Sequence, residues 1–285
     1  MSSQLSLFGD RVDVYETAKR RYGVWPLTVW DVDHQDKTYH KLKGLIGDDG
    51  QGRGECFTKE TQDKSVYRGK VTESIFNPQI GIWLLNCFAP SSGHCFDPFG
   101  GGGTRAILAA KHGLSYTGIE LRKAEVDAVN RRCLQNGVAD RVNIIQGDAR
   151  NAVALVGERG ADFLLTCPPY YDLETYNGGS ADLSMAPSYH AFLEGMGRVV
   201  RQCFSVMCHG TTSVWVVGLH RNTNGELLAL NHDIARLHRE AGFLLKEEII
   251  LAHRNNGAIQ RVGNFEKGNR WLVRTHEYAL VFRKK

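Results

Sequence analysis

Acidic and glycine-rich segments at three places in the sequence carry residue types that could hold a polar ligand. The first is Asp97-Pro98-Phe99-Gly100-Gly101-Gly102-Gly103-Thr104, where glycines let the backbone turn sharply and approach a ligand closely. Glu120 stands seventeen residues after Gly103, and an acid there can accept hydrogen bonds from both hydroxyls of a ribose. Asp148, which follows Gly147, could accept one from an adenine amino group. Together these segments predict a pocket for an adenosine-containing cofactor.

Two cofactors compete for such a pocket. Gly101-x-Gly103-x-x-Ala106 satisfies the dinucleotide fingerprint, in which a pyrophosphate lies at the free N-terminus of a helix. Asp97 is expected at the end of a strand with its charge facing the pocket, where it would repel a pyrophosphate. S-adenosylmethionine carries a sulfonium and an ammonium group and no phosphate. The charge therefore favours S-adenosylmethionine, and a glycine-rich turn without a ligand is the remaining alternative.

A second distinctive segment is Thr166-Cys167-Pro168-Pro169-Tyr170-Tyr171. Its two prolines donate no backbone N–H and stiffen the turn, which leaves carbonyl oxygens free to accept hydrogen bonds. Tyr170 offers a flat face on which a base could stack. This combination suits an exocyclic amino group on a planar ring. The alternative is a rigid structural turn with a core tyrosine.

The elements that would position these segments alternate between strands and helices. Asn77 and Pro78 are expected to begin a helix as its cap and its first residue. Further helices are expected at about 105–112, 123–135, 188–207 and 226–241, and strands at 94–96, 115–119, 142–145, 161–166, 213–217, 244–252 and 276–283. The alternation predicts a parallel sheet with helices on both faces and a ligand beyond the carboxyl ends of the strands. No helix separates the last two strands, so one of them is expected to be antiparallel.

Residues 1–65 are more polar, and we interpret them as an N-terminal extension packed on a main domain of residues 66–285. Within this extension, residues 25–30 could form a short strand or a docking segment. No apolar run reaches the roughly 18 residues needed to span a membrane, and the first twelve residues contain no secretory segment. The seven cysteines are odd in number and form no CxxC pair, which argues against disulfides and zinc. These features predict a cytoplasmic protein without a metal.

The net charge of +4 is concentrated near the end of the sequence. Residues 253–285 hold eight basic and two acidic side chains, so the preceding chain carries about −2. A basic segment on a near-neutral body fits a phosphate-contacting patch, with a solvated loop and tail as the alternative. The predicted DNA-contacting loop, residues 254–275, contains Arg254, Arg261, Lys267, Arg270 and Arg274.

These motifs resemble those of a known enzyme family. Asp97-Pro98-Phe99-x-Gly101-x-Gly103-Thr104 resembles the cofactor motif of amino-group DNA methyltransferases, and Cys167-Pro168-Pro169-Tyr170 resembles their catalytic (Asp/Asn/Ser)-Pro-Pro-Tyr motif. Phe76-Asn77-Pro78 resembles the cofactor-side motif that can precede the glycine loop. The run beginning CPPYYDLETY, with HEYALVFRK near the end, is similar to phage and prophage DNA methylases. The resemblance covers about residues 65–285.

The resemblance implies a class I SAM-dependent methyltransferase fold, which is Rossmann-like with a seven-stranded, mostly parallel sheet whose last strand is antiparallel. It places in the cofactor site Phe76, Asn77, Asp97, Phe99, Gly101, Gly103, Thr104, Glu120 and Asp148. It places at the flipped target base Cys167, Pro168, Pro169 and Tyr170, with Tyr171 beside them on the DNA.

Cys167 departs from this family pattern, which has Asp, Asn or Ser at that position. A thiol accepts hydrogen bonds weakly, so the carbonyl of Pro168 would carry more of the polarisation of the amino group. Cys167 could instead be a covalent nucleophile, as in cytosine-C5 methylation, but that family places its cysteine after a proline. The substitution leaves adenine N6 and cytosine N4 both open.

The predicted activity is methyl transfer from S-adenosylmethionine to an exocyclic amino group, adenine N6 or cytosine N4, in double-stranded DNA. The target base must be flipped out of the duplex to reach the pocket. Methylation of an RNA base is one alternative, because related folds use similar Pro-Pro-Tyr turns on RNA. A protein that binds S-adenosylmethionine and DNA with weak or no catalysis is another.

Overall fold

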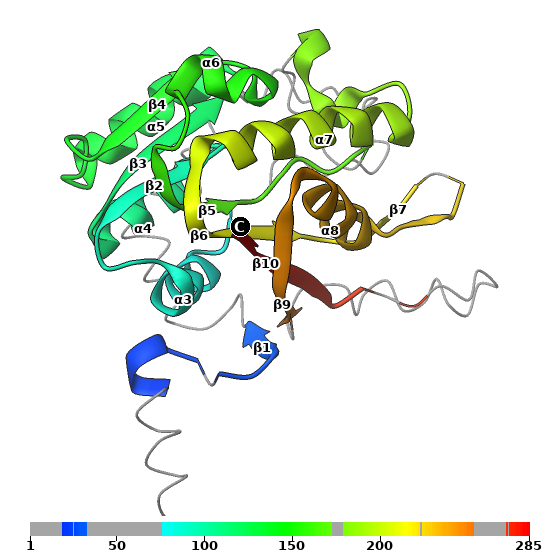
Figure 1. Cartoon of the computed structure of the whole chain (residues 1–285), viewed down its shortest axis with the longest axis horizontal. Helices are drawn as coiled ribbons and strands as arrows, with labels where there is room; N and C mark the ends of the chain where they lie inside the picture. The colour runs from blue at the N-terminus through cyan, green and yellow to red at the C-terminus, as the bar shows by residue number, and fades with distance from the viewer. Residues whose placement is uncertain are drawn as a thin grey trace, which may run out of the picture.

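The computed structural model describes residues 19–24, 26–32, 76–172, 179–222, 224–253, 272 and 274–285. In this part of the chain, one mixed sheet lies between two layers of helices (Figure 1). The helices are α3 (Pro78–Phe88), α4 (Thr104–His112), α5 (Lys123–Gln135), α6 (Ala152–Val156), α7 (Tyr189–Val206) and α8 (Leu230–Ala241). Short 3-10 helices cover Ala149–Asn151, Gly179–Ala181 and Leu183–Met185.

The large sheet has the order β1-β9-β10-β6-β5-β2-β3-β4. Its strands are β1 (Val29–Val32), β2 (Gly93–Asp97), β3 (Leu114–Glu120), β4 (Val142–Gln146), β5 (Ala161–Thr166), β6 (Met207–Val217), β9 (Phe243–His253) and β10 (His276–Lys284). β10 runs antiparallel to both of its neighbours, β6 and β9. The strands from β6 to β4 are mutually parallel, so their carboxyl ends meet at one edge. The expected mostly parallel sheet with an antiparallel last strand is confirmed.

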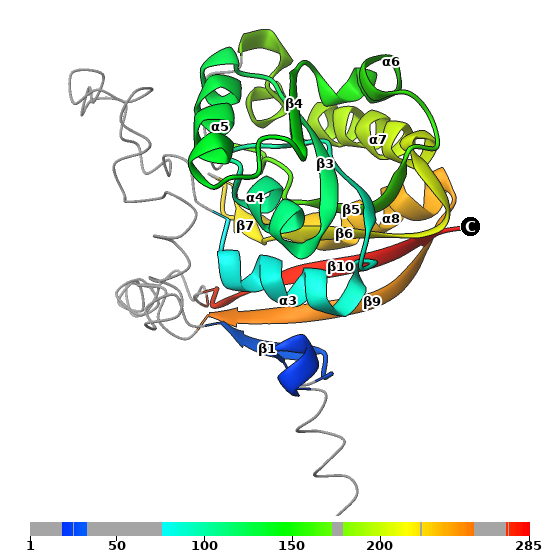
Figure 2. The ribbon, with the colours of Figure 1, turned by 90° about the vertical axis from the view of Figure 1, so that its left-hand side faces the viewer.

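β1 extends the sheet from the seven predicted strands to eight. It comes from the N-terminal region and pairs in parallel with β9, from Val29 opposite Ile250 to Val32 opposite His253 (Figure 2). Trp30 and Val32 are buried, whereas the residues between and before them are exposed. The predicted domain boundary near residue 65 lies outside the described residues.

Some element boundaries differ from those expected. α8 begins at Leu230 rather than near residue 226, because β7 (His220–Arg221) and β8 (Leu227–Leu228) form a small antiparallel hairpin before it. β6 begins at Met207, directly after α7, and is longer than the predicted strand at 213–217. α6 was not predicted.

The start of α3 shows how the sequence determines a helix end. The side chain of Asn77 accepts a hydrogen bond from the backbone N–H of Gln79 at 2.9 Å, and Pro78 takes the first helical position. Gly81 lets α3 approach α4 closely, since a Cβ there would lie 2.7 Å from Leu108 Cδ1. α3 is thereby fixed against the element that carries the glycine loop.

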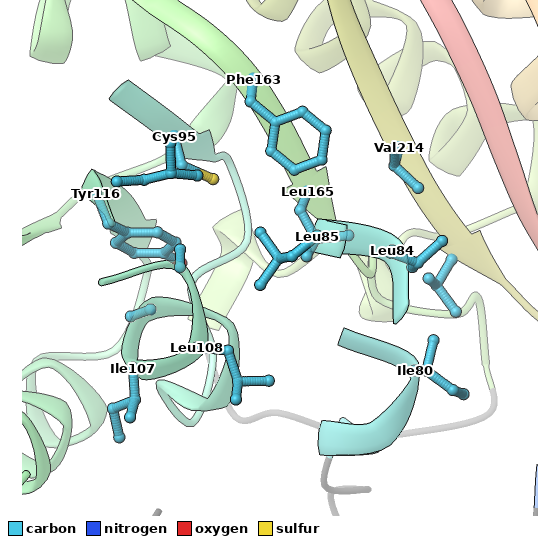
Figure 3. Packing of buried hydrophobic residues seen from close by; sticks show 14 of the residues in the cluster. Ile80, Leu84, Leu85, Cys95, Ile107, Leu108, Tyr116, Phe163, Leu165 and Val214 are labelled. Atoms are coloured by element: carbon cyan, nitrogen blue, oxygen red, sulfur yellow. The ribbon is translucent and has the colours of Figure 1, made fainter. Parts of the chain in front are cut away.

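Two hydrophobic clusters lie on opposite faces of the sheet. One contains residues of α3, α4 and α5, such as Ile80, Leu84 and Ile107, against Phe163 and Val214 of the sheet (Figure 3). The other contains the apolar faces of α7 and α8. The half-buried Cys167 contacts both clusters, because it lies where the sheet ends.

Candidate cofactor and base site at the carboxyl ends of the strands

The carboxylate of Asp97, the last residue of β2, is fully buried and accepts hydrogen bonds from four groups. Its Oδ1 accepts from the backbone N–H of Phe99 at 2.9 Å and from the hydroxyl of Thr166 at 2.6 Å. Its Oδ2 accepts from Arg105 Nε at 2.7 Å and from the hydroxyl of Tyr116 at 2.9 Å. Asp97 therefore connects the glycine-rich loop to α4, β3 and β5.

This geometry corrects the expectation that the charge of Asp97 faces the pocket. The charge of Asp97 does not face a pocket; it faces Arg105, whose guanidinium also donates to the carbonyl of Phe99 and lies 4.9 Å from the ring centroid of Phe76. Burial alone would lower the pKa of Arg105, but the charge and hydrogen bond of Asp97, together with Tyr116 and Cys167, outweigh it and raise that pKa. Because Arg105 neutralises it, the charge of Asp97 does not favour a cationic cofactor over an anionic one.

Sequence reasoning missed the three side chains that hold Asp97. Arg105 could have been singled out from the sequence, because the helix dipole disfavours a cation in the first turn of a helix. A cation at such a position indicates a specific acidic partner. Tyr116 and Thr166 are 19 and 69 residues from Asp97, and nothing in their local sequence indicates the contact.

The loop between β2 and α4 is tied to the ends of the neighbouring strands. The backbone N–H of Gly100 donates to the carbonyl of Ile119 at 2.8 Å, and that of Gly101 donates to Glu120 Oε2 at 3.1 Å. The N–H of Gly147 donates to the carbonyl of Glu120 at 3.0 Å. The ends of β2, β3 and β4 are thereby held together around Glu120.

Glu120 points its carboxylate at this loop and is 9% exposed. Its Oε1 accepts from the backbone N–H of Arg122 at 2.9 Å. Burial raises the pKa of Glu120, and the hydrogen bonds and charge of Arg122 offset this only in part. The carboxylate occupies the strand-end position at which an acid can bind a ribose.

Gly103 packs against α5 so closely that a side chain would not fit. Its φ is 82°, in the left-handed region, and a Cβ there would lie 2.8 Å from Val129 Cγ1. Behind the loop, Arg132 donates to the carbonyl of Gly102 at 2.7 Å and pairs with the buried Glu125 at 3.1 Å. The glycine backbone beside a buried carboxylate fits the methionine and ribose parts of S-adenosylmethionine.

Asp148 caps the 3-10 helix after β4 and is bound by Arg150. The backbone N–H of Arg150 donates to Oδ1 at 2.9 Å, and the guanidinium donates to Oδ1 at 3.0 Å and to Oδ2 at 2.9 and 2.6 Å. Burial alone would raise the pKa of Asp148, but the hydrogen bonds from Arg150 outweigh it and lower that pKa. Arg150 also donates to the carbonyl of Ala181 at 3.3 Å.

The other predicted cofactor residues have structural contacts. Asn77 caps α3, as predicted for the helix start. The ring of Phe99 packs edge-on against Trp215 with centroids 6.2 Å apart, and Thr104 is the first residue of α4. Phe99 and Thr104 flank the glycine loop, whereas Asn77 belongs to the helix before it.

The proline turn directly follows Thr166 at the end of β5. Pro168 is buried, and Cys167 and Pro169 are half-buried. The ring of Tyr170 is also buried, at 8% exposure, and its hydroxyl lies 3.8 Å from Cys167 Sγ. The expected open aromatic face is therefore absent at Tyr170 in this structure, which has the core tyrosine of the alternative interpretation.

Tyr171 belongs to an aromatic cluster with α7. Its ring centroid lies 5.6 Å from that of Tyr189 and 5.8 Å from that of Phe192. The next residue, Asp172, has a φ of 52° and donates its N–H to the carbonyl of Ser184 at 3.2 Å. The segment after the turn is thus anchored to α7 and to the 3-10 helix that precedes it.

Most of the predicted DNA-contacting loop lies outside the described residues, including Arg254, Arg261, Lys267 and Arg270. Arg274 is described and half-buried. Within the part of the chain that the structure describes, no group of His, Cys, Asp and Glu side chains could hold a metal ion. None of its helices combines the length and apolarity needed to cross a membrane.

The fold is that of class I SAM-dependent methyltransferases. A structure from Galdieria sulphuraria, described as a candidate sarcosine dimethylglycine methyltransferase, matches 73% of this chain and 85% of its own, with 12% identity and a TM-score of 0.51. At this identity the likeness establishes the fold and not the activity. No curated protein matches the sequence.

Residues 92–234 match the model of the RNA cap guanine-N2 methyltransferase family, and this is half of the chain. The chain therefore belongs to that family, is a SAM-dependent methyltransferase and uses S-adenosyl-L-methionine as its cofactor.

Two further structures, both from Thermus thermophilus, resemble part of the chain. TrmN matches 74% of it at 15% identity with a TM-score of 0.48. A candidate DNA modification methylase, complexed with S-adenosyl-L-methionine, matches 48% of it at 30% identity with a TM-score of 0.36. The chain spans about half the length of each, 49% and 53%, so neither assigns it a substrate.

Proposed function

We propose that this methyltransferase acts on DNA and methylates an exocyclic amino group, adenine N6 or cytosine N4, of a base flipped out of the duplex. The observation that carries the proposal is the proline turn at the end of β5, whose preceding residue, Thr166, is hydrogen-bonded to Asp97 of the glycine loop at 2.6 Å. The turn has two consecutive residues without an N–H beside the cofactor loop. Its resemblance to the catalytic motif of amino-group DNA methyltransferases favours DNA.

In this proposal the cofactor supplies an electrophilic methyl group, and the residues of the chain position the partners. Glu120 and Asp148 bind the ribose and adenine parts of the cofactor. The methionine part is bound by the loop of Asp97, Phe99, Gly101, Gly103 and Thr104, with Phe76 and Asn77 behind it. A turn without competing donors suits an amino group, because both of its hydrogens need acceptors.

The target side of the proposal rests on the turn itself. The carbonyl groups of Cys167 and Pro168 accept hydrogen bonds from the amino group and orient its nitrogen toward the glycine loop, and Pro169 keeps the turn rigid. Positioning of this kind can supply much of the rate acceleration. Stacking of the base on Tyr170 belongs to the same proposal and requires that ring to become uncovered when the base enters.

Contacts to the DNA backbone are assigned to the basic segment after β9. This part of the proposal rests on composition, because phosphate contacts need cations and the segment is rich in them. The residues are Arg254, Arg261, Lys267, Arg270 and Arg274, with Tyr171 beside the turn.

The test is transfer of labelled methyl from S-adenosylmethionine to unmodified DNA, followed by nucleoside mass spectrometry. Label in N6-methyladenine or N4-methylcytosine is expected and identifies the base. A Pro168→Ala, Pro169→Ala variant restores two backbone donors and is expected to lose transfer while retaining cofactor binding. Absence of label in DNA, despite measurable cofactor binding by the parent protein, would refute the DNA proposal.

A second candidate is methylation of guanine N2 in RNA, and the family match favours it. Guanine N2 is also an exocyclic amino group, so the same turn would serve. The labelling assay is therefore run in parallel on capped and uncapped RNA, with N2-methylguanosine as the product measured. Label in RNA and none in DNA would replace the first candidate with the second.

A further inference from the structure

We propose that Thr166 is a positioning residue that couples the cofactor loop to the turn that receives the base. This inference rests on the proposed function of the turn, which it deepens. Its basis is one buried hydrogen bond, from Thr166 Oγ1 to Asp97 Oδ1 at 2.6 Å, between the last residues of β5 and β2. Both side chains are completely buried.

This hydrogen bond lies just beyond the end of the backbone pairing between β2 and β5. The backbone pairing of β2 with β5 includes Cys95 opposite Phe163 and ends with Phe96 opposite Leu164. Beyond that point the two strand ends lead to different halves of the site, the glycine loop after β2 and the proline turn after β5. The bond from Thr166 to Asp97 continues the connection where the strand pairing stops.

Asp97 is rigidly held from the cofactor side, so it can transmit a change in the loop. The same carboxylate oxygen that accepts from Thr166 also accepts from the N–H of Phe99 in the loop, at 2.9 Å. The other oxygen is fixed by Arg105 and Tyr116. Movement of the loop on cofactor binding must therefore move, or be resisted by, the residue that begins the turn.

The expected consequence is that cofactor binding orders the turn through Thr166. Loss of the hydroxyl leaves the other three partners of Asp97 in place, so the cofactor loop keeps its shape. The turn loses its link to the loop, and the target is held less accurately. A misplacement of this kind is expected to lower kcat by about tenfold to 100-fold.

The test compares Thr166→Val, Thr166→Ser and a matched control, Thr117→Val, which removes a buried hydroxyl from the neighbouring strand β3. Hydrogen–deuterium exchange is measured with and without S-adenosylmethionine, in peptides covering residues 98–108 and the amides of Tyr170 and Tyr171. In the parent, T166S and T117V, the cofactor is expected to slow exchange in both regions. In T166V it is expected to slow exchange in residues 98–108 alone.

Kinetics supply the second measurement. T166V is expected to lose kcat while its Kd for the cofactor changes by less than about threefold, and T166S is expected to restore kcat. Should T166V not fold, Thr166→Cys, whose thiol is a weak donor, takes its place. Equal protection of both regions in T166V, or protection confined to residues 98–108 in the parent, would overturn the coupling. The exchange comparison needs no nucleic acid, so it decides this question even if no DNA or RNA is methylated.

Discussion

Three carboxylates at the carboxyl ends of the strands differ in the groups of the protein that bind their negative charge. Asp97 is paired with Arg105 in the interior, and Asp148 is paired with Arg150 at the surface of the site. Glu120 is instead held by the backbone N–H of Gly101 in the loop it faces and by that of Arg122, with only a longer contact of 3.4 Å to the Arg122 side chain. Of these three, Glu120 has the environment most suited to a ligand's hydroxyl groups.

Glu120→Gln is expected to weaken cofactor binding by about tenfold to 100-fold. The amide keeps the size of the side chain but removes the charge, and hydrogen bonds to charged groups contribute about 1.5–3 kcal/mol. Isothermal titration calorimetry with S-adenosylmethionine measures the effect. Asp127→Asn removes an exposed acid from α5 that pairs with Lys123, and it serves as the control. Equal affinities in the two variants would exclude Glu120 from the cofactor site.

Cys167→Ser is expected to retain or raise methyl transfer. A hydroxyl accepts hydrogen bonds better than a thiol, and the residue already lies within 3.8 Å of the Tyr170 hydroxyl, so the exchange fits the local geometry. The initial rate of labelled methyl transfer measures it. Complete loss of activity, together with a covalent adduct between the parent protein and its substrate, would instead identify Cys167 as a nucleophile.

The residue-level chemistry was only partly predictable from sequence. The acid at 120 and the proline turn stand out because glycine, acid and proline each leave a local signature. The inward charge of Asp97 and the buried ring of Tyr170 leave none, because burial depends on partners distant in sequence. Thr166, which binds Asp97, is an ordinary strand residue until the fold brings β2 and β5 together.

At the scale of elements, the shape of the glycine loop depends on the close approach of α4 and α5. Gly103→Ala is expected to destabilise the protein by about 2–4 kcal/mol and to weaken cofactor binding, since it combines a left-handed backbone with overpacking against Val129. Gly137→Ala is the matched control, because its φ of 67° is also left-handed but a Cβ there meets nothing within 4 Å. The cost of G137A is expected to be about 1–2 kcal/mol, from the backbone alone.

Urea denaturation and calorimetry measure the two effects of this pair. Equal destabilisation by G103A and G137A would mean that the contact with Val129 relaxes without cost. Normal cofactor affinity in a folded G103A protein would mean that the loop does not need its present shape.

Element boundaries were predictable where caps and glycines mark them and not elsewhere. α5 begins and ends where its pattern predicts, and Gly242 ends α8. The start of α8 was misplaced because the residues of β8 also suit a helix, and only the pairing of β8 with β7 decides. Residues 25–30 left a short strand and a docking segment both open, and the pairing of β1, residues 29–32, with the edge of β9 decides for a strand.

At the scale of the whole molecule, a fully buried histidine makes stability depend on pH. His238 of α8 stacks on Phe282 with ring centroids 3.8 Å apart and lies 4.7 Å from Trp215. Burial lowers its pKa from 6.5 to about 3. The unfolded chain therefore binds a proton between pH 6.5 and 3 that the folded protein excludes, and stability falls as the pH falls through that range.

The contribution of His238 is expected to be about 2 kcal/mol between pH 7.5 and pH 5, as its unfolded form becomes protonated. His238→Leu should reduce the fall in the free energy of unfolding between pH 7.5 and pH 5 by that amount, as measured by chemical denaturation across the range. His190→Leu is the control, because that histidine is exposed on α7. Identical slopes in the parent and His238→Leu proteins would show that His238 is not buried as described.

The position of β10 has a consequence for synthesis on the ribosome. Residues 276–284 are translated after every other strand of the sheet, yet they lie between β6 and β9 in its interior. Until they leave the exit tunnel, β9 has no antiparallel partner, and the pair of β1 and β9 is not joined to β6. The strands β2 to β6 can associate during translation, whereas the other edge of the sheet must wait until β10 has been made. A ribosome that stalls before β10 is complete would hold an assembled cofactor half beside an unpaired strand edge, which is the kind of surface that chaperones bind.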